Sequence, residues 1–223
     1  NAVFRSFQTE VETVYEEKNR ALDNASRQIY DAVSAALYTS HPYGRSVLGT
    51  IEHLKNPSIS KMEEFYGKWY VPNNMAVVLA GDFDSEEALA LITEHFGAME
   101  RGELPTEPLP EPPPVDGETS LHLRHNADEQ VRYAWQTVRR GHPDESALIL
   151  ADMLLDNSAS GMLDRNLNNP QKLRSSGSSS SVMKYAGQQL IWGRPRTSQS
   201  LDEVKDLLLE QIDLLKSGSF SDE

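Results

Sequence analysis

The amino-acid sequence predicts an α+β fold, in which helices pack on a largely antiparallel sheet. First, apolar residues recur at helical spacing in long segments such as 3–23 and 144–156. Second, short apolar or alternating runs gather in clusters between those segments, which is typical of strands. Third, no repeat with a period of about 20–50 residues is visible, so no solenoid is expected.

Each predicted helix carries its apolar residues on one face and has recognisable ends. Capping boxes are expected at Ser60-Lys-Met-Glu63 and Ser200-Leu-Asp-Glu203, where the first side chain bonds to the backbone of the last residue. Ser85 is expected to cap a helix that Gly97 ends. The predicted helices span residues 3–23, 26–37, 60–69, 85–97, 144–156, a short segment ending near 167, and 200–218.

The predicted strands lie mostly in the second half of the chain. Met75–Ala80 is a continuous apolar run ended by Gly81-Asp82, which indicates a buried strand. The Ser-rich run Ser175–Ser181 is expected to be a polar strand or loop, and Trp135 and Trp192 are expected to serve the core. The remaining predicted strands span residues 120–125, 129–137, 175–185 and 188–192.

Composition excludes several classes of function. The chain has 223 residues, and its 21 Lys and Arg against 34 Asp and Glu give a formal charge of −13, which argues against a nucleic-acid partner. No apolar run approaches the roughly 20 residues that a membrane span needs. Cys is absent, which removes disulfides, thiolate zinc sites and cysteine nucleophiles. Composition does not assign a compartment, and both cytoplasm and periplasm stay open.

Two features bear on domain organisation. The chain begins with Asn rather than Met, and its opening segment has the pattern of a helix interior, so we expect it to be a piece of a longer protein. Residues 103–118 hold six of the 12 prolines. A segment so rich in proline is extended and cannot join the interior of a sheet, so it is expected to be a linker.

The candidate site lies in the first predicted helix. Glu10 and Glu17 are seven residues apart, which is two helical turns, so both carboxylates point the same way. Their neighbours along that face are the apolar Phe7, Val14 and Ala21. An ionised carboxylate on a buried face is costly unless a metal, a cation or hydrogen bonds accompany it. The alternative is two solvated or salt-bridged acids on a helix that packs less deeply.

The sequence holds no complete motif for a catalytic zinc site, which takes three protein ligands and a water. H-x-x-E-H does not occur in it, and neither do G-x-S-x-G or a phosphate loop. His122 and His125 are three residues apart in a predicted strand, which places them on opposite faces. His142-Pro-Asp-Glu145 contains Pro and lacks a closing His.

Nearly the whole chain resembles the pitrilysin/insulinase family of zinc metallopeptidases, the group with the inverted H-x-x-E-H motif. In the second half, the less specific Asn157-Ser-Ala-Ser-Gly161 with Asn166-Leu, and Gly193-Arg-Pro to Leu201-Asp-Glu-Val, are similar to bacterial members. Three stretches of the first half carry the resemblance more specifically. Glu10-Val-Glu-Thr-Val-Tyr-Glu-Glu17 is similar to the family segment that supplies the third zinc ligand. His41-Pro-Tyr-Gly followed by Leu48-Gly-Thr is similar to a family loop. The run from Phe65 through Tyr70-Val-Pro-Asn-Asn-Met to Gly81-Asp82 resembles the most recognisable stretch of the family.

The resemblance implies a role for each acid and an architecture for the chain. Glu17 would be a zinc ligand and Glu10 a supporting acid that orients a ligand or its helix. The H-x-x-E-H helix, with two ligands and the general base, would lie before residue 1, so no residue of this chain is assigned a catalytic role. The implied architecture is that of mitochondrial-processing-peptidase-like repeats. Residues 1–102 would form the last part of the zinc-carrying repeat and the start of the second unit. Residues 103–118 would be the linker, and residues 119–223 would complete the second, non-catalytic repeat.

The resemblance further implies a zinc endopeptidase that acts on peptides and works with a second half of the same chain or a homologous subunit. We expect the 223 residues alone to be inactive, because one ligand and no base cannot support the chemistry. Two alternatives stay open: a non-catalytic structural or partner subunit of the same fold, and a domain that binds peptide without cleaving it. The Arg/Tyr pair with which the family holds substrate is assigned to no residue of this chain.

Overall fold

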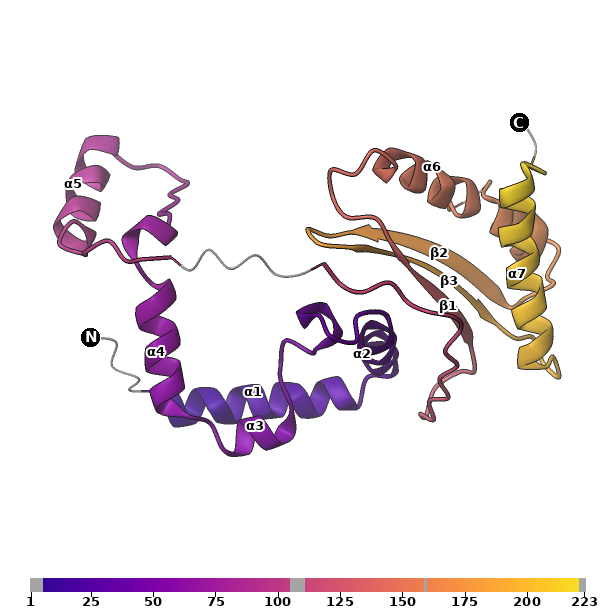
Figure 1. The fold of residues 1–223 in the computed structure, drawn as a ribbon, viewed down its shortest axis with the longest axis horizontal. Helices are drawn as coiled ribbons and strands as arrows, with labels where there is room; N and C mark the ends of the chain where they lie inside the picture. Colours follow the sequence, from indigo (N-terminus) through magenta and orange to yellow (C-terminus); the bar gives the residue numbers. More distant parts are fainter. Residues whose placement is uncertain (1–5, 105–110, 159, 221–223) are drawn as a thin grey trace. The chain divides into compact units, whose positions relative to one another are not determined.

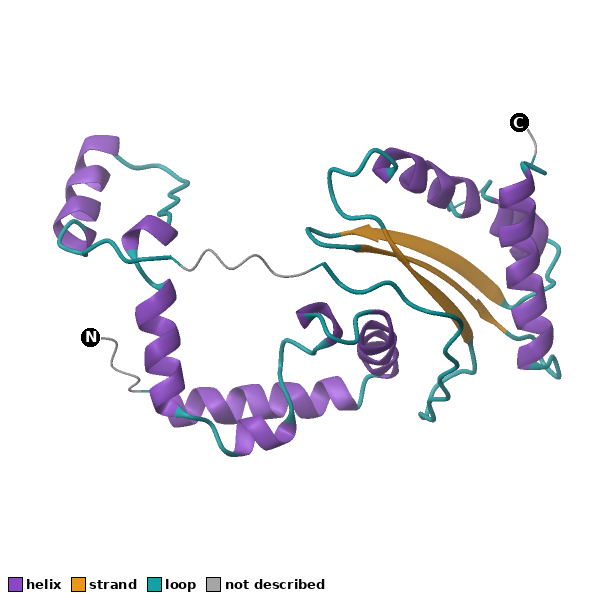
Figure 2. Cartoon of the chain, viewed as in Figure 1, coloured by secondary structure: helices purple, strands orange, loops and turns teal. Residues whose placement is uncertain are grey.

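The computed structural model describes residues 6–104, 111–158 and 160–220 (Figure 1). The chain divides into two compact units, one formed by residues 1–18 and 48–108 and the other by residues 19–47 and 109–223. The α+β class is confirmed, because helices accompany an antiparallel sheet (Figure 2). None of the helices in the described part of the chain is long and apolar enough to cross a membrane.

The first unit is helical throughout its regular elements. Its helix ends are set by short polar side chains that accept bonds from free backbone amides: Ser58 from Lys61 at 3.3 Å, and Asp84 from Glu86 and Glu87 at 2.9 Å. The predicted caps Ser60 and Ser85 are therefore wrong. The elements are most of α1 (Phe7–Leu22), α3 (Ile51–Lys55), α4 (Ile59–Trp69), the 3₁₀ turn η2 (Pro72–Asn74) and α5 (Ser85–Phe96).

The predicted strands at 75–80 and 120–125 are wrong. Both segments lack regular secondary structure, and their side chains are exposed, with Val78 at 86% and Leu121 at 50%. An apolar run predicts burial, whereas a strand also needs a neighbour for its backbone N–H and C=O groups. Neither run pairs with a strand among the described residues.

The second unit is built round a three-stranded antiparallel sheet in the order β1-β3-β2. The strands are β1 (Val131–Thr137), β2 (Ser175–Val182) and β3 (Gly187–Arg194). Tyr133 lies opposite Ile191 of the central strand, and Ile191 lies opposite Ser178. Side chains alternate between the faces of a strand, so this register decides which residues meet on each face of the sheet.

The main core lies between one face of the sheet and two helices, α6 (Glu145–Leu155) and α7 (Leu201–Ser217). Ile191, Val204 and Leu208 are fully buried there, and Tyr133 and Trp135 pack against them. The other buried members are Leu155, Met162, Leu163, Leu167 and Leu173. Apolar residues at helical spacing in α7 predict an inward side of Leu201, Val204, Leu208, Ile212 and Leu215, which is confirmed except for Leu201, 41% exposed.

The opposite face of the sheet carries a smaller core with α2 (Ala25–Leu37). Leu37, Tyr38 and Ala186 are buried in it, with Ala134 of β1 packed alongside. The Tyr38 hydroxyl donates to the Gly187 carbonyl at 2.9 Å. This bond anchors the end of α2 to the central strand.

Residues at the end of α6 cover the outer edge of β2. Asp152 Oδ2 accepts from the Ser180 amide at 3.0 Å, and Asp156 Oδ2 accepts from the Ser178 amide at 3.0 Å. Asp152 Oδ1 also accepts from the Ser178 hydroxyl at 2.6 Å and from Gln189 Nε2 at 2.7 Å. An edge strand otherwise offers unpaired amides to other chains, so these carboxylates close this edge.

The ends of α7 follow its sequence signals. The predicted capping box is confirmed: Glu203 N donates to Ser200 Oγ at 3.2 Å, and Ser200 N donates to Glu203 Oε2 at 2.9 Å. Gly218 ends the helix with a positive φ of 69°, a conformation that glycine adopts without strain. The short helix expected to end near 167 is instead a π-helical turn, η3 (Asp164–Asn168).

Candidate functional site

The two candidate acids lie on α1, whose sequence favours a regular helix. The Thr13 hydroxyl donates to the Thr9 carbonyl at 2.9 Å, and Gln8 Nε2 donates to Glu12 Oε1 at 2.9 Å, both at i,i+4 spacing. Glu10 lies in the first turn, where the helix dipole favours negative charge. Local interactions therefore support the backbone that carries both acids.

Glu10 and Glu17 are exposed, so the interpretation of two solvated acids on a helix that packs less deeply holds, and the buried stripe does not. The less exposed side of α1 carries Phe7, Val11 and Val14, and its most buried residue is Lys18 at 8%. At 100° per residue, both acids lie at the margin of that side. The apolar pattern did not predict which side of α1 is packed, because a lysine, rather than an apolar residue, occupies the most buried position.

The Glu17 carboxylate is exposed. It makes no ion pair with any residue in the described ranges, so it is free to bind a cation. No group of three or more His, Asp or Glu side chains that could hold a metal occurs among the described residues. Glu17 is therefore not part of a complete metal site among the described residues.

The His41-Pro-Tyr-Gly44 loop forms the 3₁₀ turn η1 (Pro42–Gly44) in the second unit. His41 Nδ1 accepts from the Tyr43 amide at 3.1 Å, and the ring is 2% exposed. Burial and then the charge of Arg45 lower the pKa of His41, which favours the neutral imidazole. A Cβ at Gly44 would overlap the Tyr38 carbonyl oxygen, so only glycine fits. The role of the motif in this chain is to hold a turn.

The other family-like stretches are also explained by local structure. Gly49 has a φ of 69°, and Thr50 accepts from the His53 amide at 3.3 Å as the cap of α3. In the Pro-Asn-Asn turn, Asn73 exchanges two 3.0 Å bonds with the backbone of Gly102. Asn74 Nδ2 donates to the Trp69 carbonyl at 2.9 Å, which closes the end of α4.

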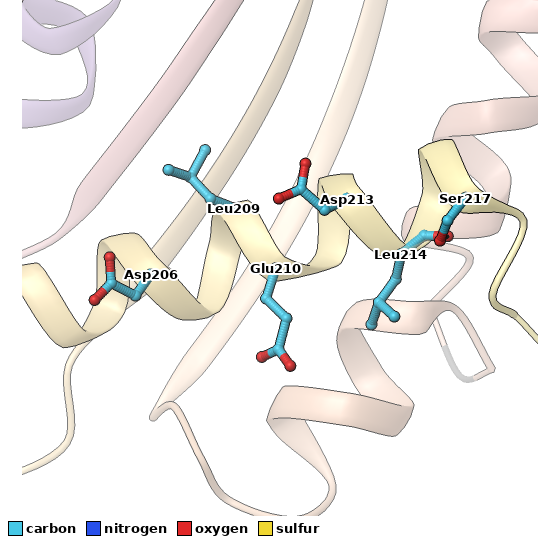
Figure 3. Close-up of a pocket in the computed structure, with 6 residues that line it drawn as sticks. All are labelled: Asp206, Leu209, Glu210, Asp213, Leu214 and Ser217. Carbon is cyan, nitrogen blue, oxygen red and sulfur yellow. Dashed lines mark hydrogen bonds between the residues drawn. The ribbon is translucent and has the colours of Figure 1, made fainter.

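A shallow hollow of about 510 Å³ lies against the exposed side of α7 (Figure 3). Three carboxylates border it, and they come from one helix. It is lined by Asp206, Leu209, Glu210, Asp213, Leu214 and Ser217. The hollow contains neither a nucleophile with a base nor a metal-ligand set, so it is not a candidate for the chemistry.

Sequence reasoning missed the polar side chains of the sheet. Asp152 lies in a helix whose centre is almost wholly apolar, and its partners Ser178 and Gln189 come from two strands. Arg132 and Arg194 likewise were not predicted as site residues, although the register brings them to one face. The spacing of residues within one helix or strand could not predict these two groups of side chains, because the pairing of strands brings them together.

The comparisons with known proteins agree with one another. Residues 58–223 match the family model described as "Peptidase M16 inactive domain". An uncharacterized zinc protease of Mycobacterium tuberculosis is 30% identical over 159 residues, which are 70% of this chain and 36% of that protein. A protease structure from Helicobacter pylori has a TM-score of 0.81 at 21% identity, covering 100% of this chain and 55% of that one.

A solved peptidase M16 inactive domain from Pseudomonas fluorescens has a TM-score of 0.73 at 18% identity, covering 96% of this chain and 52% of that one. At such identities the structures show the fold alone. The chain spans 28–36% of the length of the first curated relatives and about half of the first solved chains.

Proposed function

Because this chain belongs to the peptidase M16 family, and its residues 58–223 match the inactive domain of that family, we propose that it is the largely non-catalytic part of a zinc-dependent endopeptidase. The observation that carries the proposal is this match, together with relatives that are named zinc proteases. The proposed reaction is hydrolysis of a peptide bond by a zinc-bound water. The proposed substrate is a peptide held between two halves of the enzyme.

We propose that Glu17 contributes one zinc ligand. Its carboxylate is exposed and makes no ion pair with a described residue, so binding a cation breaks no existing ion pair. When bound, zinc would polarise the scissile carbonyl and lower the pKa of its water. The other ligands and the general base are assigned to residues outside this chain.

Glu10 is proposed to orient the site. It lies two turns before Glu17 on the same side of α1, and both carboxylates are exposed. Acids that hydrogen-bond to a ligand or its neighbours fix the geometry of a metal site, and losing one costs about 10–100-fold in metal affinity or activity. Glu10 would therefore act on the ligand rather than on the substrate.

We propose the domain organisation that the sequence predicts. Residues 1–102 would end a zinc-carrying repeat and begin the second unit, 103–118 would link, and 119–223 would complete the second repeat. One of the three boundaries between the compact units, the one after residue 108, supports a joint in this region, whereas the other two, after residues 18 and 47, assign residues 19–47 to the unit that holds the sheet. Residues 105–110 of the proposed linker lie outside the described residues.

The test compares hydrolysis of unfolded peptides by two proteins in the presence of zinc. One is the 223-residue chain, and the other is the longer chain that includes the residues preceding Asn1. We expect zinc-dependent hydrolysis by the longer chain alone. Turnover by the 223-residue chain would contradict the assignment of the base to outside residues. Peptide binding without cleavage by the longer chain would instead identify a non-catalytic member of the fold.

A further inference from the structure

Two arginines lie side by side on the sheet face opposite the main core. Arg132 of β1 pairs across the strands with Trp192 of β3, and Arg194 lies two residues further along β3. Directly paired residues share a face, and so do residues two apart, so all three side chains project from one face. Diagonal neighbours in antiparallel strands are about 7–8 Å apart, within reach of long side chains.

Both guanidinium groups are positioned by contacts within the same unit. The Trp192 ring lies close over Gly177, where a Cβ would come within 2.8 Å of it. The Arg194 guanidinium lies 5.5 Å from the centre of that ring. Arg132 Nε donates to Gln130 Oε1 at 3.2 Å, which fixes the second group. Each group is thus held in place before any ligand arrives.

Neither positive charge is neutralised in the described structure. No carboxylate of the described residues forms an ion pair with Arg132 or Arg194, whereas the nearby Arg174 pairs with Asp128 at 3.0 Å. Burial and then the charge of Arg194 lower the pKa of Arg132. Arg194 Nε is buried and has no hydrogen-bond partner among the described residues.

Two unpaired cations held together are unfavourable, and their occurrence is unexpected in a chain of net charge −13 with 34 acidic residues. Arginine side chains present forked donors that match the oxygens of carboxylate and phosphate groups. We propose that Arg132 and Arg194 form an oxyanion-binding site, with Trp192 as its floor, that takes a carboxylate or phosphate group.

The ¹⁵N–¹H signals of the arginine Nε groups test the proposal on the 223-residue chain. Inorganic phosphate and glutarate are titrated separately at a constant ionic strength of about 0.1 M, with chloride as the compensating anion. We expect saturable shifts of the Arg132 and Arg194 signals, with a dissociation constant on the order of 1 mM. The stronger of the two titrations identifies whether the site prefers phosphate or carboxylate.

Three variants separate a built site from general attraction of anions. Arg132→Gln and Arg194→Gln should each weaken binding by about tenfold or more. Arg174→Gln, which removes an exposed arginine that already has a partner, should leave binding unchanged. Thermal unfolding gives a second readout, since the anion should raise the midpoint of the wild type and not of the first two variants.

Two results would overturn the proposal. One is a linear, non-saturating shift for both anions. The other is a binding curve that all three variants share, because binding would then reflect the general electrostatic attraction of the protein for anions rather than Arg132 and Arg194. A purely structural role of Arg194 against Trp192 predicts no anion dependence in either readout.

Discussion

Replacing Asp152 with alanine should loosen the sheet of the second unit. The two carboxylate oxygens of Asp152 accept from the Ser178 hydroxyl at 2.6 Å, from Gln189 Nε2 at 2.7 Å and from the Ser180 amide at 3.0 Å. Alanine removes all of these acceptors at once. The donors come from two strands, so both β2 and β3 lose hydrogen bonds.

The expected loss of stability is set by these bonds. A hydrogen bond to a charged group contributes about 1.5–3 kcal/mol, but Asp152 is partly exposed, so water replaces part of that loss. We expect the free energy of opening of the sheet to fall by about 3 kcal/mol. Asp152→Asn should lose less, because its remaining carbonyl oxygen can still accept from Ser178 or Gln189.

Amide hydrogen exchange of the β3 backbone is the appropriate assay, because it reports the opening of the sheet separately from the first unit. Asp213→Ala is the matched control: this exposed acid forms an ion pair with Lys216 at 3.8 Å, so its effect should stay below about 0.5 kcal/mol. A change for Asp152→Ala no larger than that of the control would refute the reasoning that these carboxylates close the edge.

Three further predictions concern stability and are read from urea unfolding. Burial raises the pKa of Tyr38 from 10.0 to about 12, so the stability that its neutral hydroxyl contributes is complete below pH 10 and is lost as the pH rises toward 12. Tyr38→Phe should abolish this fall of about 3 kcal/mol. Gly44→Ala should cost about 1–3 kcal/mol, because its Cβ overlaps backbone; no loss would show that the loop adjusts freely. Ser200→Ala should cost about 1 kcal/mol by removing the cap of α7, and an unchanged midpoint would contradict the capping role.

Much of the fold could be predicted where local signals decide it. The capping box at Ser200 and the glycine at Gly218 bound α7 correctly, because both act through their own helix. The strand predicted at Met75–Ala80 was wrong. Its apolar residues indicate burial, but the sequence of a segment does not specify which strand it pairs with. The five-residue α3 (Ile51–Lys55) is too short for periodicity to reveal.

In the candidate site too, features set within one helix could be predicted and features set by packing or strand pairing could not. The spacing of Glu10 and Glu17 placed both acids on one side of α1, which a regular helix guarantees. Their exposure agrees with the alternative of two solvated acids; spacing alone could not choose it, because the buried Lys18 places the packed side of α1 away from the apolar stripe. The neighbouring arginines Arg132 and Arg194 depend on the register of β1 against β3, which spacing within either strand does not contain.

The measurement that tests the central proposal most directly is the zinc content of the longer chain, determined together with its peptide hydrolysis, after Glu17→Gln. Glu16→Gln is the matched control, since it removes an exposed acid from the adjacent position of the same helix. If Glu17 is a zinc ligand, its variant should hold far less than one zinc per chain and lose hydrolysis, while the Glu16 variant keeps both. Full zinc content and unchanged hydrolysis in the Glu17 variant would contradict the assignment.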